Sequence, residues 1–354
     1  MVMRGGTSKG AFFVADDLPD DVGERDAILL GVMGSPDVRQ IDGIGGANPL
    51  TSKVAVVAPS SRDDADIDYL FLQIAVDLPQ VSDRQNCGNL LAATAPFAVE
   101  RGMIRVDPTA ETATVRVYMV NTDSIATSTF RVRDGQPDYR GDVSIDGVPG
   151  TAAPVRLDFE GIAGGSCGAL LPTGNPVDTI DGIDVTLIDN GMPVVVMRAA
   201  DLGVSGTETP AELEADETLR TRLESIRLQA GPLMNLGDVA DTTVPKLTMV
   251  SEPTAGGDLS TRTFIPHRCH DAIGVLGAVS VATAAMLPGT PAASVLRPGA
   301  GHGMVTCEHP SGTFTATISM SEPTSPGAPF RVERAEIIRT ARKLMDGTVF
   351  PTDH

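Results

Sequence analysis

Apolar and polar positions along the chain follow the same order twice. Near the start, a glycine turn leads into an apolar stretch that ends in Ala15-Asp16-Asp17-Leu18. Far downstream, Asp189-Asn190-Gly191 leads into a stretch that ends in Ala199-Ala200-Asp201-Leu202. Apolar residues at helical spacing follow each of them, over 24–33 and 216–229. Internal similarity of this kind predicts two copies of one structural unit.

A lysine and a cysteine then recur in each half. Lys53 and Lys246 each begin an apolar segment that is expected to be a strand. Cys87 and Cys269 are each expected to open a helix of small residues, the first over 88–100 and the second over 271–287. Two such halves predict a cleft between them, with a lysine and a cysteine at the mouth of each half.

The segments between these repeats look strand-rich. A strand is expected over 69–76, and alternation over 113–160 predicts antiparallel strands. Segment 321–329 has no apolar pattern and is expected to be an exposed loop. The repeat divides the chain into two domains, 1–150 and 151–354, with the last strands either staying in the second domain or returning to the first.

Composition supports a folded chain with many turns. The chain has 354 residues, of which 42% are apolar, 37 are glycine and 26 are proline. This length fits about two domains. Aromatic residues make up only 4% and Trp is absent, so the core is expected to consist of aliphatic side chains and Met.

The net charge of −19 restricts the partners. Binding to nucleic acid needs a basic face, so that function class is excluded. An anionic substrate would need local positive charge from a few Arg or Lys side chains and helix N-termini. No segment is long and apolar enough to span a membrane. The four cysteines are widely spaced, which indicates free thiols in a reducing compartment, and the cytoplasm is the expected location.

Cys87 lies in the turn Asn86-Cys87-Gly88-Asn89. A thiol in the first turn of a helix lies at the positive end of the helix dipole, which favours the thiolate. Gly88 and Asn89 would leave backbone N–H groups open to an oxyanion. A buried structural cysteine is the alternative, but the polar residues before Cys87 place it at a surface or cleft.

Lys53 follows Ser52 and a glycine-rich loop. A lysine partly removed from water beside an apolar strand gives up its proton more readily and can act as a base. A solvent-facing lysine at a strand edge is the equally weighted alternative. In the second half, His267-Arg268-Cys269-His270 lacks a further ligand cluster, so no metal is expected. His267 and Arg268 are interpreted as positive charge near an anion, and Arg262 is a further candidate.

Several motifs together resemble the PrpF family, in particular its 4-oxalomesaconate tautomerases of gallate catabolism. The resemblance covers nearly the whole chain. It rests on these motifs: Met3-Arg4-Gly5-Gly6-Thr7-Ser8-Lys9-Gly10, Thr51-Ser52-Lys53, Gln85-Asn86-Cys87-Gly88-Asn89, Ile188-Asp189-Asn190-Gly191-Met192-Pro193 and Ile265-Pro266-His267-Arg268-Cys269-His270.

The resemblance implies an α+β fold of the diaminopimelate-epimerase type. Such a fold has two pseudo-symmetric domains, each with a curved, mainly antiparallel sheet around a central helix. It also implies an isomerase of small di- and tricarboxylates that uses neither cofactor nor metal. The catalytic pair would be Lys53 and Cys87. The expected substrate-binding residues are Arg4, Thr7, Ser8, Ser52, Gly88, Asn89, Met192, Arg262, His267 and Cys269.

The implied reaction is movement of a proton and a double bond in an unsaturated tricarboxylate, with 4-oxalomesaconate as the first candidate. The alternatives are a methylaconitate or methylitaconate type of isomerase and a non-catalytic tricarboxylate-binding protein. An epimerase would need a reactive cysteine pair. The frequency of twofold symmetry among oligomers gives a homodimer as the default expectation.

Overall fold

The structure is a computed structural model that describes residues 1–84, 86–321 and 330–352. It divides into two units. Unit 1 comprises Met1–Asp158 and Ile338–His354, and unit 2 comprises Phe159–Ile337. From the sequence we placed this division near residue 150. Most of the expected exposed loop at 321–329 lies outside the described residues.

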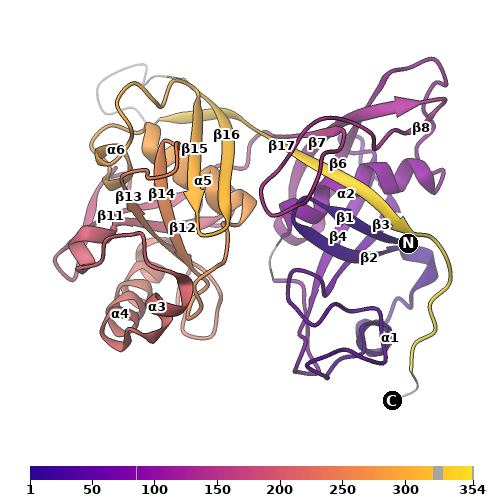
Figure 1. The fold of residues 1–354 in the computed structure, drawn as a ribbon, viewed down its shortest axis with the longest axis horizontal. Coiled ribbons are helices and arrows are strands. Elements are labelled where there is room, and N and C mark those ends of the chain that lie inside the picture. The colour runs from indigo at the N-terminus through magenta and orange to yellow at the C-terminus, as the bar shows by residue number, and fades with distance from the viewer. Residues whose placement is uncertain (85, 322–329, 353–354) are drawn as a thin grey trace. The chain divides into compact units, whose positions relative to one another are not determined.

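Unit 1 is a sheet closed around helix α2 (Gly88–Glu100), as Figure 1 shows. In ring order its strands are β1 (Val2–Gly5), β2 (Ser8–Val14), β3 (Lys53–Pro59), β4 (Ile67–Ile74), β6 (Thr112–Met119), β7 (Ser124–Arg133), β9 (Pro154–Phe159) and β17 (Arg331–Met345). Each strand pairs with the next, and β17 pairs with β1 and so closes the ring. The pairings of β2 with β3 and of β4 with β6 are parallel.

Helix α2 is suited to the inside of this ring. Its sequence consists mostly of Ala, Leu, Val and Thr, and nearly all of its residues are buried. Small side chains let the strands approach the helix on all sides. The helix bounds are those expected from the sequence.

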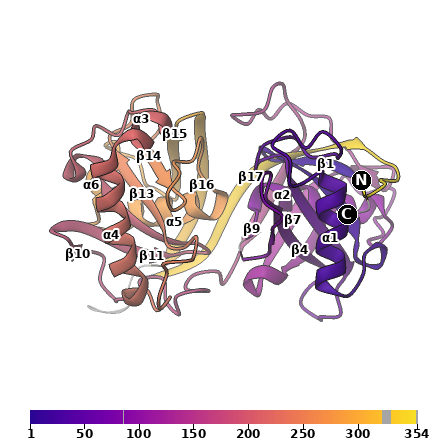
Figure 2. The same cartoon turned by 90° about the horizontal axis from the view of Figure 1, so that it is seen from below.

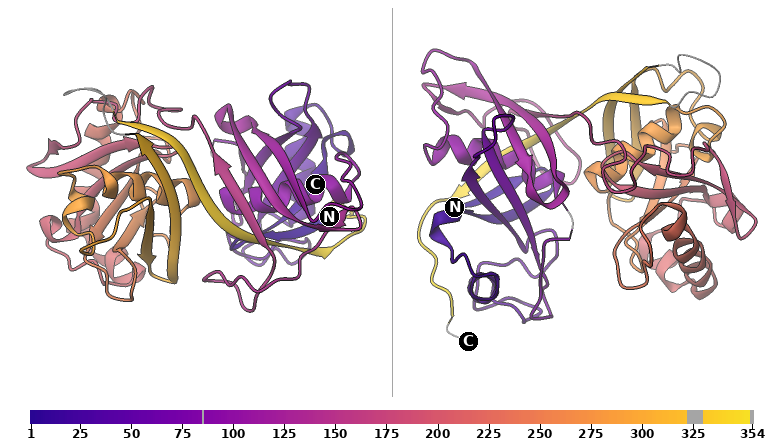
Figure 3. Two further views of the ribbon diagram at one scale, coloured as in Figure 1. Left: turned by 90° about the horizontal axis from the view of Figure 1, so that it is seen from above. Right: turned by 180° about the vertical axis from the view of Figure 1, so that it is seen from behind.

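Helix α1 (Val22–Met33) packs on the outer face of the same sheet. Asp21 caps its N-terminus by accepting from the Glu24 N–H, and Gly34 ends it in the left-handed conformation. Its residues Leu29 and Met33 join Val54 and Leu72 in a core cluster. The chain after β17 runs past α1 (Figure 3), where Thr352 lies against Gly31.

Unit 2 repeats the strand order of unit 1. Its strands are β10 (Asp178–Ile180), β11 (Ile183–Asp189), β12 (Pro193–Arg198), β13 (Lys246–Ser251), β14 (Leu259–Phe264), β15 (Met304–His309) and β16 (Gly312–Ser321). From β11 to β16 the pairings are antiparallel, parallel, antiparallel, parallel and antiparallel. The series β1, β2, β3, β4, β6, β7 has the same directions.

Helices cover both faces of the unit 2 sheet (Figure 2). Helices α3 (Pro210–Ala215) and α4 (Glu217–Leu233) lie on one side, where α4 joins Leu247 and Met249 in the core. Helix α5 (Val275–Met286) lies on the other, beside the short α6 (Pro291–Ser294). The first half of β17 pairs with β16 and the second half with β1.

Short elements fill the connections. They are β5 (Val81–Ser82), β8 (Gln136–Pro137) and the 3₁₀ turns η1 (Ala15–Asp17), η2 (Val120–Thr122) and η3 (Ala199–Leu202). The expected turn at Asp134-Gly135 joins β7 to β8, with positive φ at both residues. Among the described residues, no helix combines the length and the apolar character needed to cross a membrane.

The second small-residue helix was predicted wrongly at its start. Helix α5 begins at Val275 after Gly274, so Cys269 does not open it. Residues around Cys269 instead form a bridge with the end of β14, between Phe264 and Cys269. Backbone pairing to that strand therefore holds the segment extended where the sequence suggested a helix.

Candidate active site

Cys87 caps the N-terminus of α2. Its backbone is extended, and its Sγ accepts from the Leu90 N–H at 3.5 Å. The side chain is 8% exposed, and the Ser8 Oγ lies 3.9 Å from the Sγ. A helix N-terminus carries partial positive charge. The thiol therefore lies where negative charge on sulfur is stabilised.

The turn between β1 and β2 packs directly on this helix start. A Cβ on Gly5 would lie 2.4 Å from the Asn89 carbonyl oxygen, and one on Gly6 would lie 2.1 Å from the Asn89 Oδ1. Gly6 also has a φ of +50°, which favours glycine. The Thr7 N–H donates to the Asn89 Oδ1 at 3.4 Å. These glycines bring Thr7 and Ser8 to the start of α2.

Lys53 begins β3 and is 7% exposed. Its Nζ donates to the Gln73 Oε1 at 3.0 Å and lies 5.0 Å from the centre of the Phe71 ring. The amide of Gln73 is held in turn, since its Nε2 donates to the carbonyl oxygens of Pro49 and Ser52. The partner of the buried lysine is thus a fixed neutral amide rather than a carboxylate.

Lys53 and Cys87 lie on the same side of the sheet. Gly10 pairs with Lys53, and Lys53 pairs with Gln73, so all three face one way. A Cβ on Gly10 would lie 3.2 Å from the Leu90 Cδ1, which identifies that side as the one covered by α2. The sequence-predicted pair therefore shares one face within unit 1.

Ser52 has a different environment from its neighbour. It is fully buried, and its hydroxyl donates to the Gln40 Oε1 at 2.7 Å and to the Asn48 carbonyl. Gln40 also accepts from the Ala47 N–H, so it ties together the glycine-rich loop before β3. Ser52 holds this loop in place and does not present a free hydroxyl, in contrast to the substrate contact expected from the sequence.

Arg4 lies on the face opposite to Lys53 and Cys87. Gly5 faces α2, so its neighbour Arg4 faces away, as alternation along a strand requires. The Arg4 Nη1 donates to the Gly6 carbonyl at 2.8 Å and to the carbonyl and hydroxyl oxygens of Thr340. Arg4 therefore holds the glycine turn from the face opposite to Lys53 and Cys87, and its role in substrate binding stays a prediction.

In unit 2 the corresponding lysine has no partner. Lys246 begins β13 and is 4% exposed, and its Nζ has no hydrogen-bond partner in the described part of the chain. Burial, with a smaller effect from Arg227, lowers the pKa of Lys246 to about 7. Extending the β13–β14 register places Ile265 opposite Lys246, where Gln73 lies opposite Lys53.

Met192 lies in the turn before β12, the counterpart of the turn at Gly6. The Met192 carbonyl accepts from the Ser280 hydroxyl of α5 at 2.7 Å. Gly191 in the same turn has a φ of +84°, and a Cβ there would lie 3.3 Å from the Leu276 side chain. The turn is thus fixed on α5 as the first turn is fixed on α2.

The remaining candidates of unit 2 are engaged with acidic residues or with the backbone. The Arg262 Nε donates to the Glu208 carbonyl at 2.7 Å, and burial lowers the pKa of Arg262. The Cys269 N–H donates to the Glu214 Oε1, and burial raises the pKa of the Cys269 thiol to about 12. His267 is exposed, with its Nδ1 3.8 Å from Glu224. Cys269 is consequently a neutral thiol at pH 7.

Two residues near the candidate pair were missed from the sequence. Gln73 is the acceptor for Lys53, and the Tyr69 hydroxyl donates to the Cys87 carbonyl at 3.2 Å. Burial raises the pKa of Tyr69 well above its ordinary value, so it stays a hydrogen-bond donor. A signal existed for Gln73, since it is a polar residue directly after the apolar run Leu70-Phe71-Leu72 of β4. The described residues include no group of three His, Cys, Asp or Glu side chains that could hold a metal ion.

Comparison with known proteins places the chain among isomerases. The model of the PrpF protein family matches residues 1–352. The chain is 53% identical to the (4E)-oxalomesaconate Delta-isomerase of Novosphingobium sp. over 99% of its length and 96% of that protein. It is 54% identical to the 4-oxalomesaconate tautomerase of Pseudomonas putida, over 99% and 94%. A crystal structure of methylitaconate-delta-isomerase matches with a TM-score of 0.82 and 35% identity, over 98% of this chain and 93% of that one. The chain therefore belongs to the PrpF family, and it is an isomerase of that family.

Proposed function

We propose that the chain isomerises 4-oxalomesaconate, with Lys53 and Cys87 as its catalytic residues. The proposed substrate rests on sequence identity. More than half of all residues, over nearly the full length, are identical to those of two proteins with that activity in their names. The proposed catalytic role of Lys53 and Cys87 rests on the structure, in which a buried lysine and a helix-capping thiol lie on one face of unit 1.

The two units, with the same strand directions and a helix inside each, fit a diaminopimelate-epimerase-like architecture. The two helix starts differ in their caps. The thiol of Cys87 caps α2 with a side-chain hydrogen bond, whereas Gly274 at the start of α5 makes no such bond.

Lys53 is proposed to move the proton. In 4-oxalomesaconate the proton to be moved is acidified by the keto group and the double bond. The neutral form of Lys53 removes it, and the electron pair of the C–H bond passes into a dienolate. The Gln73 Oε1 accepts a hydrogen bond from the Lys53 Nζ and so orients it.

The start of α2 is proposed to stabilise the dienolate. The first N–H groups of a helix have no partner within it. The Leu90 N–H is taken by the Cys87 Sγ, which leaves the Gly88 and Asn89 N–H groups as donors for an oxyanion. Each donor of this kind contributes roughly 3 kcal/mol to a charged transition state.

Return of the proton completes the reaction. A proton goes back to a different carbon from the Lys53 ammonium or from the Cys87 thiol, and the double bond moves accordingly. Cys87 is the nearer group to the helix start, and Ser8 lies within 3.9 Å of its sulfur. If a variant that lacks Cys87 still exchanges substrate protons with solvent, Lys53 is identified as the base and Cys87 as the acid.

The experiment compares substrates on the purified chain. We expect turnover of 4-oxalomesaconate to exceed that of methylitaconate in kcat/KM by at least about 100-fold, about 2.7 kcal/mol of discrimination. The reverse preference would favour the second candidate, a methylitaconate type of isomerase, which the match to the methylitaconate-delta-isomerase structure supports. Binding of both acids without deuterium uptake from D₂O would indicate a non-catalytic binding protein.

A further inference from the structure

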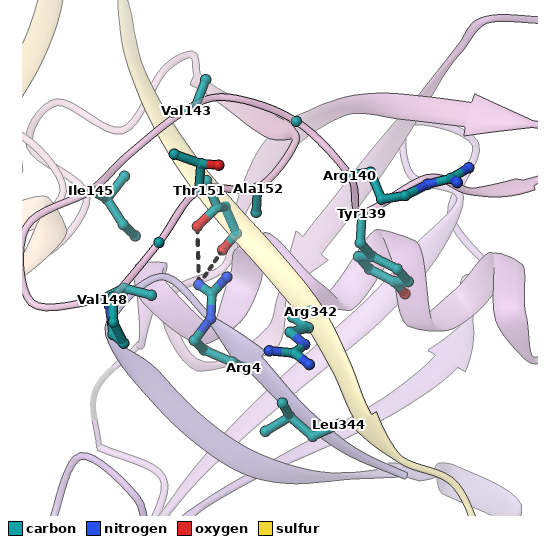
Figure 4. A pocket seen from close by; sticks show the side chains of 14 residues that line it. Arg4, Tyr139, Arg140, Val143, Ile145, Val148, Thr151, Ala152, Arg342 and Leu344 are labelled. Atoms are coloured by element: carbon teal, nitrogen blue, oxygen red, sulfur yellow. Dashed lines mark hydrogen bonds between the residues drawn. The ribbon is translucent and has the colours of Figure 1, made fainter.

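A pocket of about 500 Å³ lies on unit 1, away from the Lys53 and Cys87 face. Its floor is the face of β1 and β17 that carries Arg4, and its wall is the loop 139–152 (Figure 4). Arg4 and Arg342 pair across these two strands, so their side chains lie on one face of the sheet. The opposite face is the one covered by α2.

The two arginines lack acidic partners. The hydrogen bonds of Arg4 are all made by its Nη1, to uncharged oxygens, which leaves its Nε and Nη2 unused within the described residues. Arg342 has no hydrogen bond or ion pair in the part of the chain that the structure describes. In a chain of net charge −19, two facing guanidiniums without a carboxylate are unusual.

Two carboxylates near the pocket, Asp138 and Glu100, are already paired. Asp138 binds both Arg133 and Arg140, and Glu100 accepts from Lys343 and from the Tyr139 hydroxyl. Burial and the positive charge of Arg342 both lower the pKa of Arg4. An anion between the two guanidiniums would relieve this repulsion.

Part of the remaining lining is apolar. The loop contributes aliphatic side chains, and β17 contributes one more: Val143, Ile145, Val148 and Leu344. Arg140 adds a third guanidinium whose Nε binds Asp138. A ligand that satisfies this lining has an anionic end and a hydrocarbon part.

We propose that this pocket is a second binding site, which takes a small organic carboxylate. The carboxylate lies between Arg4 and Arg342, in the geometry that guanidinium groups offer to planar anions. The hydrocarbon part lies against the aliphatic wall. This site is separate from the candidate active site and does not depend on the proposed reaction.

Titration calorimetry with hexanoate tests the proposal on the full-length protein. Hexanoate has one carboxylate, a hydrocarbon chain and no double bond to isomerise, so only binding is measured. We expect the Arg342→Gln variant to bind one equivalent fewer than the wild type, or to bind it at least about tenfold more weakly. Arg105→Gln, which removes an exposed arginine of unit 1 outside the pocket, should bind like the wild type.

Four outcomes would overturn the proposal. The first is unchanged stoichiometry and affinity in Arg342→Gln. The second is inorganic phosphate binding as tightly as hexanoate, which would make the site a general oxyanion site. The third is a smaller oligomer for Arg342→Gln in light scattering, which would assign the pocket to an interface between copies. The fourth is a fall in kcat of more than about tenfold, which would place Arg342 in the active site.

Discussion

The two lysines that begin β3 and β13 occupy the same place in the fold but have opposite surroundings. Lys53 donates to the fixed amide of Gln73, whereas Lys246 faces no acceptor and is opposite Ile265 in the extended register. Both side chains are almost fully buried. The difference teaches that the repeat preserves the fold, while a single cross-strand residue decides whether the lysine is positioned for chemistry.

The two cysteines differ in the same way. Cys87 caps α2 and receives an N–H from it, whereas Cys269 lies in a strand-like segment before α5, where burial raises the pKa of its thiol to about 12. The proton chemistry is accordingly assigned to unit 1. The predictions below test this asymmetry, in order of decreasing expected effect.

Replacing each of the two cysteines by serine tests the difference between them. Cys87→Ser should lower kcat by about 100-fold or more, because serine caps a helix well but is a far weaker acid. Cys269→Ser should keep kcat within about threefold, since that thiol is only packed. Steady-state kinetics on 4-oxalomesaconate measures both. Equal losses in the two variants would contradict the assignment to unit 1.

Lys246→Met should stabilise the protein, most strongly near neutral pH. The folded pKa of Lys246 is about 7 against an ordinary 10.5, so the unfolded chain binds more protons between these values. Wild-type stability therefore rises with pH from about 7 to about 10.5 through this residue. Methionine at this position removes the free-energy cost of burying the lysine amine, which is on the order of a few kcal/mol at pH 7.

Urea unfolding of the wild type and Lys246→Met at pH 7 and pH 10 measures this effect. The stabilising difference should be clearly larger at pH 7 than at pH 10. A difference that does not change with pH, or that grows toward pH 10, would show that the Lys246 amine is not held in an unfavourable environment.

Gln73→Leu makes the surroundings of Lys53 resemble those of Lys246. We expect kcat to fall about tenfold with a smaller change in KM, because the Nζ loses its orientation. Some loss of stability should accompany this, since Gln73 also binds the carbonyls of Pro49 and Ser52. Gln136→Leu, at an exposed position, is the control. Full activity in Gln73→Leu would show that Gln73 is not needed to orient Lys53.

Gly6→Ala tests the contact between the first turn and α2. Both Gly6 and Gly182 have positive φ, so alanine at either costs about 1 kcal/mol. Only at Gly6 would the new methyl group meet Asn89, at 2.1 Å, whereas nothing lies within 4 Å at Gly182. Activity should therefore fall in Gly6→Ala alone, and matching activities in the two variants would argue against a role for this turn.

Much of the fold was predictable, because it follows from local patterns. The bounds of α2 follow from a run of small apolar residues after a capping residue, and the repeat shows in the spacing of Lys53 and Cys87 from their counterparts. The start of α5 was not predictable in this way. Pairing of Cys269 with Phe264 outweighs the small-residue pattern that suggested an earlier helix start.

The contacts of the candidate residues were only partly predictable from the sequence. The direction of Arg4 could have been deduced, since Met3 and Gly5 alternate with it and are both buried. The pairing of Lys53 with Gln73 could not, because it depends on the register between β3 and β4. The hydrogen bond from Ser52 to Gln40 likewise depends on the path of the loop between them.

The most direct test of the central claim is deuterium uptake from D₂O into 4-oxalomesaconate, followed by NMR for the wild type, Lys53→Met and Lys246→Met. The account predicts that uptake slows at least about 1,000-fold in Lys53→Met and stays within about threefold of the wild type in Lys246→Met. Circular dichroism confirms that each variant is folded. Uptake near the wild-type rate in folded Lys53→Met, or its loss in folded Lys246→Met, would contradict the assignment of proton transfer to unit 1.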